Sequence, residues 1–570
     1  MNKPASHKKT KLAAIFALSF AVSYMVFFFA PFETYLRSPH AFVIGWKFLL
    51  PQMAVFTIIS FIALSLALLL LMLHKRALDV AAFLIWGLLL ASYFQMLFLN
   101  GGMLHITMLG TIHSIPYLRL TTNLTIWVLI ALMPLIVGLL ILKDKKEPKY
   151  EKAVLYSALI ILGMQTVGII SAAATADLPV GLDENPQYFT YASLTELSSD
   201  TNVLVFVLEH MDVRHMDAVL DGYPEIYDQL DGFTFYTNNI SQYPTTFPQV
   251  AEMLTQHPYS EGQSRREYLE QAWSQHSFLD ILKENGFTIY LHVERGSTYG
   301  NMLNLRNRAD NTMAANSIKR APAATWRFTT SISMARLVPL ILKDFFVMNV
   351  SPESANRLFV METSETPQSP SIGMQSDLMF YEHIKQNDMT AMSDKKVFSF
   401  VHLNSAHPTN TLRYDAEADT IIPENSQWGS LQIESKRANF EILNVYFQKL
   451  RNAGIYDNAT IIVLGDHGRY FDANEPNPAV TTGLMIKPPG ARGRLERNNS
   501  AELSHINFGA SVLEAAGINN GSLGLSYFDI IYENLPKVRF FMDMQWSDLM
   551  EGFYEITGDA NDFANWRRIE

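Results

Sequence analysis

Five long apolar runs in the first 175 residues constrain the fold of this chain more than any other feature. A helix that crosses the hydrocarbon core of a bilayer needs about 20 consecutive apolar residues, and each run is close to or above that length. The first run resembles an uncleaved signal segment, but the four that follow it favour a membrane domain. We therefore predict a five-span transmembrane domain over residues 1–175. The runs are Leu12–Pro31, Leu49–Leu73, Leu78–Leu99, Leu124–Leu142 and Ala153–Ala174.

The loops between these runs predict the orientation of the spans. Short loops rich in Lys and Arg stay on the cytoplasmic side. One side carries Lys3, Lys8, Lys9, Lys11, Lys75, Arg76, Lys143, Lys145, Lys146, Lys149 and Lys152, and the other only Arg37, Lys47 and Arg119. We predict a multi-pass protein of the cell membrane with a cytoplasmic N-terminus and everything after the fifth span extracytoplasmic. The small residues at 171–176 suit either a leader-peptidase site or an ordinary helix end.

Charge and cysteine content narrow the possible partners. The formal net charge is -11, whereas a nucleic-acid partner calls for a basic face, so we expect none. The chain has no cysteine, which excludes disulfides, Cys-ligated metals and Cys nucleophiles. The five apolar runs make a membrane a predicted partner.

The sequence changes character after the fifth span. Residues 176–200 are polar and proline-containing, which predicts an interfacial linker. From there short runs of β-branched and aromatic residues alternate with helix-like segments, as in a largely parallel, doubly wound α/β sheet buried on both faces. We assign residues 201–535 to this catalytic domain and 536–570 to a turn-rich C-terminal appendage. The four runs are Val203–Leu208, Phe287–Leu291, Val397–His402 and Thr460–Leu464.

Acidic and histidine side chains follow two of these strands. Glu209 comes directly after the first, and Asp466 with His467 after the last. In a doubly wound sheet, ligands gather beyond the carboxyl ends of the strands. Glu, Asp and His are ordinary ligands of a divalent cation, and such a cation lowers the pKa of a coordinated hydroxyl. These residues therefore predict a metal site.

Thr246 supplies a hydroxyl between these groups in sequence. It stands two residues before Pro248, where a helical pattern begins. The positive end of a helix favours a phosphate or sulfate ester, which the hydroxyl would attack. Threonine at a helix start is also a common cap, and this stretch alone leaves both roles open. The strand-end ligands favour the nucleophile.

Three stretches resemble motifs of the alkaline phosphatase and sulfatase superfamily. Residues 202–209 look like its first metal-ligand strand and residues 458–468 like its second. Thr246–Thr255 aligns without gaps to the sulfatase nucleophile motif, with Thr246 in the Cys or Ser position. Five spans before an external catalytic domain, with a lone Glu at the first strand, are similar to lipoteichoic acid synthases and phosphoethanolamine transferases.

The resemblance implies the following site. One divalent metal, zinc or manganese, is held by Glu209, Thr246, Asp466 and His467, with Thr246 as the catalytic nucleophile. His407 and His292 match substrate-binding positions of the transferase branch. Sulfatases depend on formylglycine made from Cys or Ser, so Thr246 makes ordinary sulfatase chemistry a poor fit.

The implied reaction is a phospho-alcohol transfer. Thr246 displaces diacylglycerol from a membrane phospholipid donor and retains phosphoglycerol or phosphoethanolamine as a phospho-threonine intermediate, which then passes to a glycan or polymer acceptor. Two alternatives stay open: a membrane-anchored phosphodiesterase or sulfuric-ester-type hydrolase of the same fold, and a catalytically silent regulatory or binding protein. Residues 311–395 match no motif, and their apolar stretch Leu337–Phe346 suits packing on the core or on lipid equally.

Overall fold

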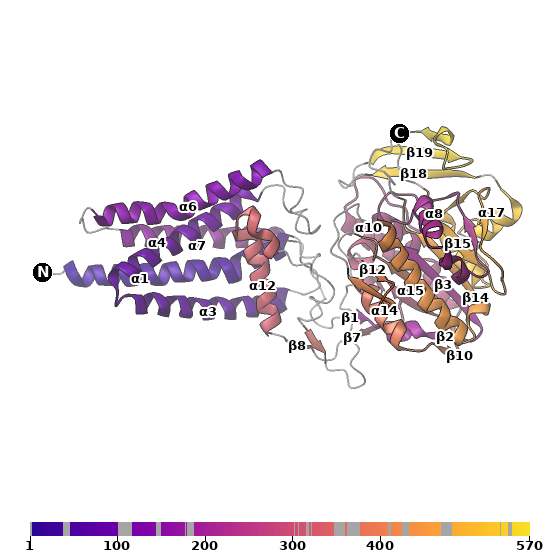
Figure 1. Cartoon of the computed structure of the whole chain (residues 1–570), viewed down its shortest axis with the longest axis horizontal. Helices are drawn as coiled ribbons and strands as arrows, with labels where there is room; N and C mark the ends of the chain where they lie inside the picture. The colour runs from indigo at the N-terminus through magenta and orange to yellow at the C-terminus, as the bar shows by residue number, and fades with distance from the viewer. Residues whose placement is uncertain are drawn as a thin grey trace. The chain divides into compact units, whose positions relative to one another are not determined.

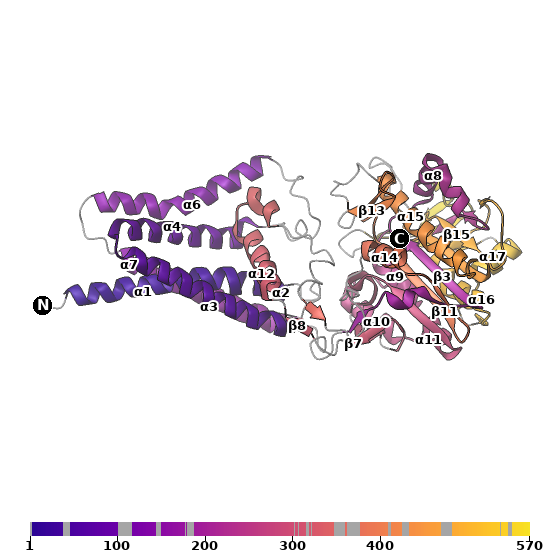
Figure 2. The ribbon, with the colours of Figure 1, turned by 60° about the horizontal axis from the view of Figure 1, so that its bottom comes forward.

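The computed structural model of the chain contains two compact units (Figures 1 and 2). A helical unit comprises residues 1–186 and 316–365, and a catalytic unit comprises 187–315 and 366–570. The structure describes residues 3–37, 46–100, 117–143, 150–176, 178, 187–300, 302–305, 307–314, 318–320, 322–346, 359–361, 377–407, 412–423, 432–468, 481–521, 523–535, 537–544 and 550–569.

Five helices in the described part of the chain are long and apolar enough to cross a membrane, which confirms the predicted spans. Their side chains pack on one another inside the bundle, while many large apolar residues are exposed on its outside, as a lipid environment requires. The spans are built from α1 (Lys3–Tyr24) with η1 (Met25–Phe29) and α2 (Ala30–Arg37), α3 (Trp46–Leu71), α4 (Lys75–Phe94) with η3 (Gln95–Leu99), α6 (Tyr117–Lys143) and α7 (Tyr150–Thr175).

A segment distant in sequence completes the helical unit. Helix α12 (Pro322–Leu337) packs on α2 and α3, and the short η9 (Leu340–Phe345) packs on α6. The indole of Trp326 lies against the rings of Phe27 and Phe56, with centroids 6.3 and 6.2 Å away. The apolar stretch 337–346 that the sequence left unassigned therefore begins within the helical unit, where Leu337 is part of the bundle core.

A seven-stranded sheet forms the centre of the catalytic unit. Its order is β16-β4-β15-β14-β3-β11-β6. The four predicted strands are adjacent and parallel at one side, and β15 runs antiparallel to both of its neighbours. This arrangement confirms the mostly parallel α/β fold. The strands are β16 (Glu496–Asn498), β4 (Thr234–Tyr236), β15 (Leu484–Lys487), β14 (Ala459–Gly465), β3 (Thr201–Leu208), β11 (Lys396–Leu403) and β6 (Phe287–His292).

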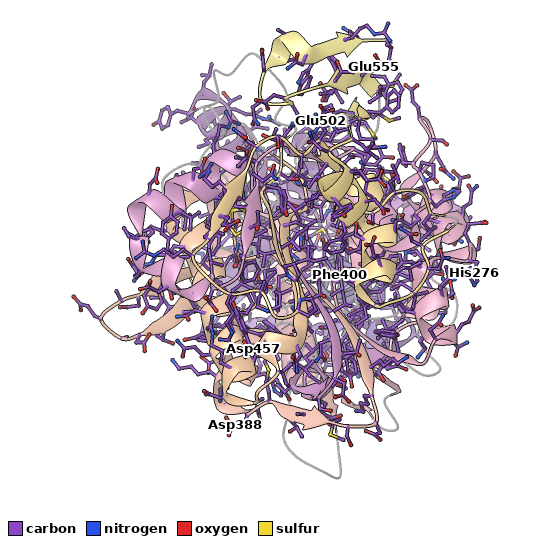
Figure 3. All side chains as sticks on the ribbon, turned by 90° about the vertical axis from the view of Figure 1, so that its right-hand side faces the viewer. His276, Asp388, Phe400, Asp457, Glu502 and Glu555 are labelled. Atoms are coloured by element: carbon purple, nitrogen blue, oxygen red, sulfur yellow. The ribbon has the colours of Figure 1, made fainter. Side chains whose placement is uncertain are left out.

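Helices cover both faces of this sheet, because alternate side chains of each buried strand point to opposite faces. In β3, Val203 and Val205 pack on one face, and Leu204 and Phe206 on the other. Phe400 lies within the core in Figure 3, whereas Asp388 lies at the rim. The first face is covered by α9 (Thr246–Thr255), α10 (Arg265–Ser274), α11 (Phe278–Glu284), α16 (Phe508–Ala515) and α17 (Tyr527–Glu533), and the second by α8 (Val213–Gly222), α14 (Asp377–Gln386) and α15 (Gln432–Asn452).

The chain also contains several small sheets. The C-terminal residues form an antiparallel sheet of β18 (Val538–Met544), β19 (Met550–Thr557) and β20 (Trp566–Arg568). Two-stranded pairs are β1 (Gln187–Phe189) with β7 (Thr312–Ala314), β2 (Glu196–Ser198) with β10 (Thr390–Met392), β5 (Asn239–Ile240) with β17 (Leu503–Ser504), β12 (Leu412–Asp415) with β13 (Thr420–Pro423), and, in the helical unit, β8 (Ile318–Arg320) with β9 (Phe359–Met361).

Candidate functional site

Glu209, His402 and Asp466 lie on one face of three neighbouring strands, at or near their carboxyl ends. Their positions follow from the alternation of the strands, because each continues a row of side chains that packs toward α9. Glu209 and Asp466 each stand just beyond a strand, and His402 is the penultimate residue of β11. All three are fully buried. The rows are Val203, Val205 and Val207 in β3, Phe398 and Phe400 in β11, and Ile462 and Leu464 in β14.

A tight turn at His210 joins two of these strand ends. Its φ of 53° is a left-handed conformation that non-glycine residues rarely adopt, and such backbone is common at functional sites. In this conformation the backbone N–H of His210 donates to Asp466 Oδ1 at 2.9 Å. The side chain then lies beside Glu209, with Nε2 3.1 Å from Oε1. The Lys436 ammonium donates to the His210 carbonyl and fixes the turn from behind.

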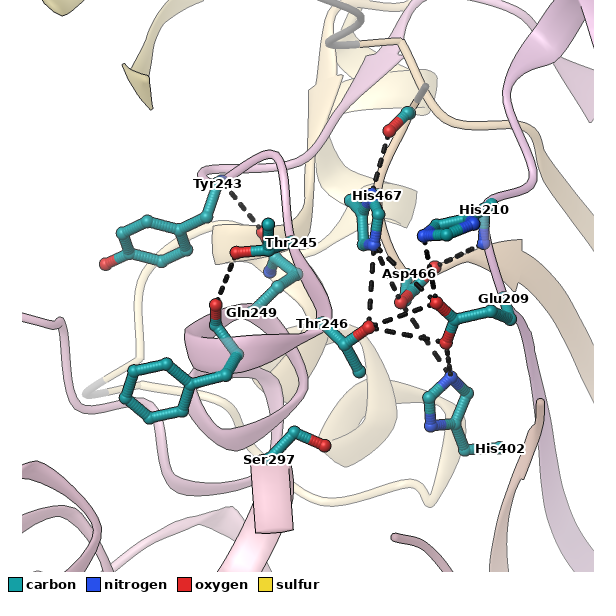
Figure 4. Close-up of polar contacts among 12 residues, drawn as sticks. Glu209, His210, Tyr243, Thr245, Thr246, Gln249, Ser297, His402, Asp466 and His467 are labelled. Carbon is teal, nitrogen blue, oxygen red and sulfur yellow. Dashed lines mark hydrogen bonds and ion pairs between the residues drawn. The ribbon is translucent and has the colours of Figure 1, made fainter. Parts of the chain in front are cut away.

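Thr246 lies against the same cluster (Figure 4). Its Oγ1 is 3.2 and 3.3 Å from the two carboxylate oxygens of Glu209 and 3.5 Å from His467 Nε2. Phe247 is non-helical, so the regular helix begins at Pro248 as the sequence predicts. The hydroxyl of Thr246 thus faces the strand-end residues. It makes no capping contact with the helix that follows.

Gln249 fixes the loop that presents Thr246. Its amide oxygen accepts from the backbone N–H groups of Gln242 at 2.7 Å and Tyr243 at 3.2 Å. The hydroxyl of the neighbouring Thr245 donates to the carbonyl of Phe247, away from the cluster. Of the two adjacent threonines, only Thr246 contacts the carboxylate and imidazole groups.

The electrostatics of the cluster are dominated by two buried carboxylates. Burial raises the pKa of Glu209, but the nearby His210, His402 and His407 more than offset it and hold that pKa well below its usual value. Burial and the adjacent Glu209 charge raise the pKa of Asp466. Burial lowers the pKa of His402, but its contacts with Glu209 and Asp466 reverse the effect and raise it. Glu209 is therefore held ionised beside Thr246, and its charge opposes the ionisation of Asp466.

These residues fit a divalent metal. Glu209, His210 and His467 offer ligand atoms within 4.8 Å of one another, and so do Glu209, His402 and Asp466. Within the described part of the chain, Asp466 Oδ2 and His402 Nδ1 are buried without a hydrogen-bond partner, and His402 Nε2 lies 3.3 Å from Glu209 Oε2. Two mutually repelling carboxylates with unpaired nitrogen and oxygen atoms are the donor set that a cation satisfies.

The two predicted substrate histidines lie at different distances from this cluster. The ring of His407 is 5.9 Å from that of His210, which is itself 4.6 Å from His467. His292, at the end of β6, is buried and stacks on Phe380 with ring centroids 5.2 Å apart. Its Nε2 is 3.9 Å from Asp377, so its described contacts are with α14, which covers the other face of the sheet, and β6 itself lies two strands from β3. His407 is the better placed of the two to meet a group on Thr246.

Two cluster residues were not in the predicted site. His402 has the appearance of a packed strand residue in the sequence, yet its Nε2 is 3.3 Å from Glu209. The signal was available, because His402 stands two residues after the core residue Phe400 and so shares its face. His210 has no comparable signal, because its direction depends on a backbone turn.

A family comparison identifies the catalytic unit. The family model described as Sulfatase matches residues 201–518. The matched range begins at β3 and includes Glu209, Thr246, Asp466 and His467. No curated protein matches the chain.

Comparison with solved structures finds three relevant similarities. A protein in the alkaline phosphatase superfamily from Vibrio parahaemolyticus is 14% identical, with 67% of this chain and 84% of that one covered and a TM-score of 0.37. The lipoteichoic acid synthase LtaP from Listeria monocytogenes is 14% identical, with 65% and 84% covered and a TM-score of 0.35. The C-terminal periplasmic domain of EcEptC from Escherichia coli, in complex with Zn, is 12% identical, with 63% of this chain and 92% of that one covered and a TM-score of 0.33.

Proposed function

Because the chain belongs to the sulfatase family, we propose that it is a membrane-bound, metal-dependent phospho-alcohol transferase. It moves a phosphoglycerol or phosphoethanolamine headgroup from a membrane phospholipid to an extracytoplasmic glycan or polymer. One observation carries the proposal: the hydroxyl of Thr246 contacts the buried Glu209 and His467 in a chain that also has five helices of membrane-spanning length. A membrane anchor keeps such a site close to a lipid donor.

The described cluster supplies the groups that this reaction needs. Glu209, Thr246, Asp466 and His467 would hold one divalent ion, zinc or manganese, which lowers the pKa of the threonine hydroxyl and neutralises charge on the phosphoryl oxygens. The N-terminus of α9 would offer backbone N–H groups to the same phosphate. His402 adds a further buried imidazole beside Glu209.

The proposed reaction has two displacements. Thr246 Oγ1 gives up its proton to solvent and attacks phosphorus, the bond to the diacylglycerol oxygen breaks, and that oxygen leaves with a proton, for which His407 is the proposed donor. An acceptor hydroxyl then gives its proton to His407 and attacks the phospho-threonine, and the bond from phosphorus to Thr246 breaks. The threonine oxygen is regenerated, so no oxidant or reductant is needed.

The test is the mass added to Thr246 when the full chain is incubated with phospholipids that carry a labelled headgroup. We expect glycerol phosphate or ethanolamine phosphate on the peptide that contains Thr246, and label transfer to an added glycan. Thr246→Ala should lose the adduct and more than about 10³-fold of the activity, because the nucleophile is gone. Thr245→Ala is the matched control and should retain both, since its hydroxyl points away from the cluster.

The same assay separates the alternatives. Label released only as free phospho-alcohol, whatever acceptor is offered, identifies a phosphodiesterase of the same fold. No adduct, together with a Thr246→Ala protein that leaves the cellular phenotype unchanged, identifies a silent binding or regulatory protein.

A further inference from the structure

One end of the helical unit contains a partly buried group of cations and amides contributed by four segments. Arg336 of α12 donates to the carboxylate of Glu33 and, at 2.7 Å, to Thr34 Oγ1. Arg37 donates to the same carboxylate. Lys343 of η9 is only 2% exposed and feels the positive charge of Arg336. Two guanidinium groups thus share one described carboxylate, and a third cation is close to one of them.

Lys343 has little compensation for its charge. Its Nζ donates to Asn100 Oδ1 at 2.8 Å, but that oxygen also accepts from Gln95 Nε2 at 2.9 Å. An ammonium has three N–H donors, so one shared amide oxygen leaves it under-satisfied. No carboxylate contacts Lys343 in the described part of the chain. Burial and the nearby Arg336 charge lower the pKa of Lys343 to about 7.

The neighbouring spans offer no further acidic residue to balance the charge of Lys343. Between Glu33 and Asp144 the only acidic residue is Asp79. Asp79 is already paired with Lys11 and Tyr150, near the beginnings of α1, α4 and α7. A buried charge without a counter-charge is costly, and in membrane proteins such charges commonly mark binding sites. The excess positive charge therefore calls for an anion from outside the described residues.

The surroundings of Lys343 favour a lipid as the source of that anion. Ile341, Leu342 and Phe345 of the same short helix are 47%, 40% and 80% exposed. Large apolar side chains exposed around a charged site suit the boundary between headgroups and acyl chains. A site that binds a soluble anion does not need exposed apolar side chains around it.

We propose that Lys343 and Arg336 bind the phosphate of an anionic phospholipid at this end of the helical unit. The phosphate oxygens accept charge-assisted hydrogen bonds from the ammonium and the guanidinium. The site binds lipid and makes or breaks no bond, so it stands independently of the reaction proposed at Thr246.

The test uses the purified full chain in maltoside micelles that contain phosphatidylglycerol or phosphatidylcholine, with retained lipid measured by native mass spectrometry. We expect preferential retention of phosphatidylglycerol, and an affinity about tenfold or more weaker in Lys343→Met, because a hydrogen-bonded charge pair is lost. Lys343→Arg should restore binding. Lys11→Met is the control at the paired site and should bind as the wild type does. Thr246→Ala should also retain lipid, which separates this proposal from the transferase.

Three outcomes would overturn the proposal. Unchanged phosphatidylglycerol affinity in folded Lys343→Met would do so, as would equal competition by inorganic phosphate, which would indicate a soluble anion. Asn123→Ala removes the acceptor of the Leu340 N–H without removing charge. If it and Lys343→Met lower the thermal midpoint equally and leave lipid preference unchanged, the network only docks η9.

A measurement on the wild type covers the case in which Lys343→Met does not fold. A phosphatidylglycerol analogue with a photoactivatable headgroup should label the peptide that contains residues 337–345. Labelling confined to other peptides contradicts the site.

Discussion

His402 lies between the two buried carboxylates of the cluster, 3.3 Å from Glu209 and 3.8 Å from Asp466. Its imidazole therefore either binds the metal directly or orients the carboxylates that do. We expect His402→Gln to weaken metal affinity by about 10–100-fold, the usual effect of losing such a group. Titration of metal-stripped protein with Mn²⁺ or Zn²⁺, with bound metal measured by mass spectrometry, checks this. The exposed His276→Gln is the control, and equal affinity in both variants would assign His402 to packing alone.

The extent to which single residues could be predicted depends on how local their signal is. Glu209, Asp466 and His467 directly follow apolar strands, so their proximity follows from parallel pairing. His402 could be predicted only by following the alternation of side chains along β11 beyond Phe400. His210 could not be predicted as a site residue, because its contact with Glu209 depends on a left-handed turn that the sequence does not specify.

Helix α9 contains a buried acid behind the face that presents Thr246. Burial raises the pKa of Glu252 to about 7, despite a hydrogen bond from Tyr243. The folded state therefore holds a proton that the unfolded state releases near the ordinary value, so stability falls as pH rises between about 4.5 and 7. The contribution is roughly 3 kcal/mol at most. Glu252→Gln should remove this decline, so that its thermal midpoint exceeds that of the wild type most at pH 8.

The readout is the difference between variant and wild-type midpoints across pH 5–8, because other groups that titrate cancel in it. Glu270→Gln, an exposed change on α10, should give a flat difference. A flat difference for Glu252→Gln as well would mean that this carboxyl is solvated.

Among the elements, length and burial decided what was predictable. The four parallel strands are long and buried on both faces, so their apolar runs stand out. β4 and β16 are three residues long, and β15 has four, which is too short for a periodic signal. The helix start at Pro248 was predictable because proline suits a first turn.

At the scale of the whole molecule, the two units are interleaved in sequence. Residues 316–365 leave the catalytic unit and join the helical one. Their partners are hundreds of residues away, as in the bond from Lys343 to Asn100, so no local pattern indicated this packing. The spans were predictable because membrane length alone identifies them.

The predicted orientation of the spans has a direct test, because the chain has no cysteine and any introduced thiol is unique. Asp388 has a side chain that is 94% exposed in the catalytic unit, and Arg76 is exposed in the first turn of α4, at the start of the third span. A membrane-impermeant maleimide should label Asp388→Cys in cells with an intact cytoplasmic membrane, and Arg76→Cys only after permeabilisation. The reverse pattern would place the catalytic unit in the cytoplasm and remove access to an extracytoplasmic acceptor. Surface substitutions of this kind cost little stability, because the Asp388–Lys449 pair is exposed and screened by solvent.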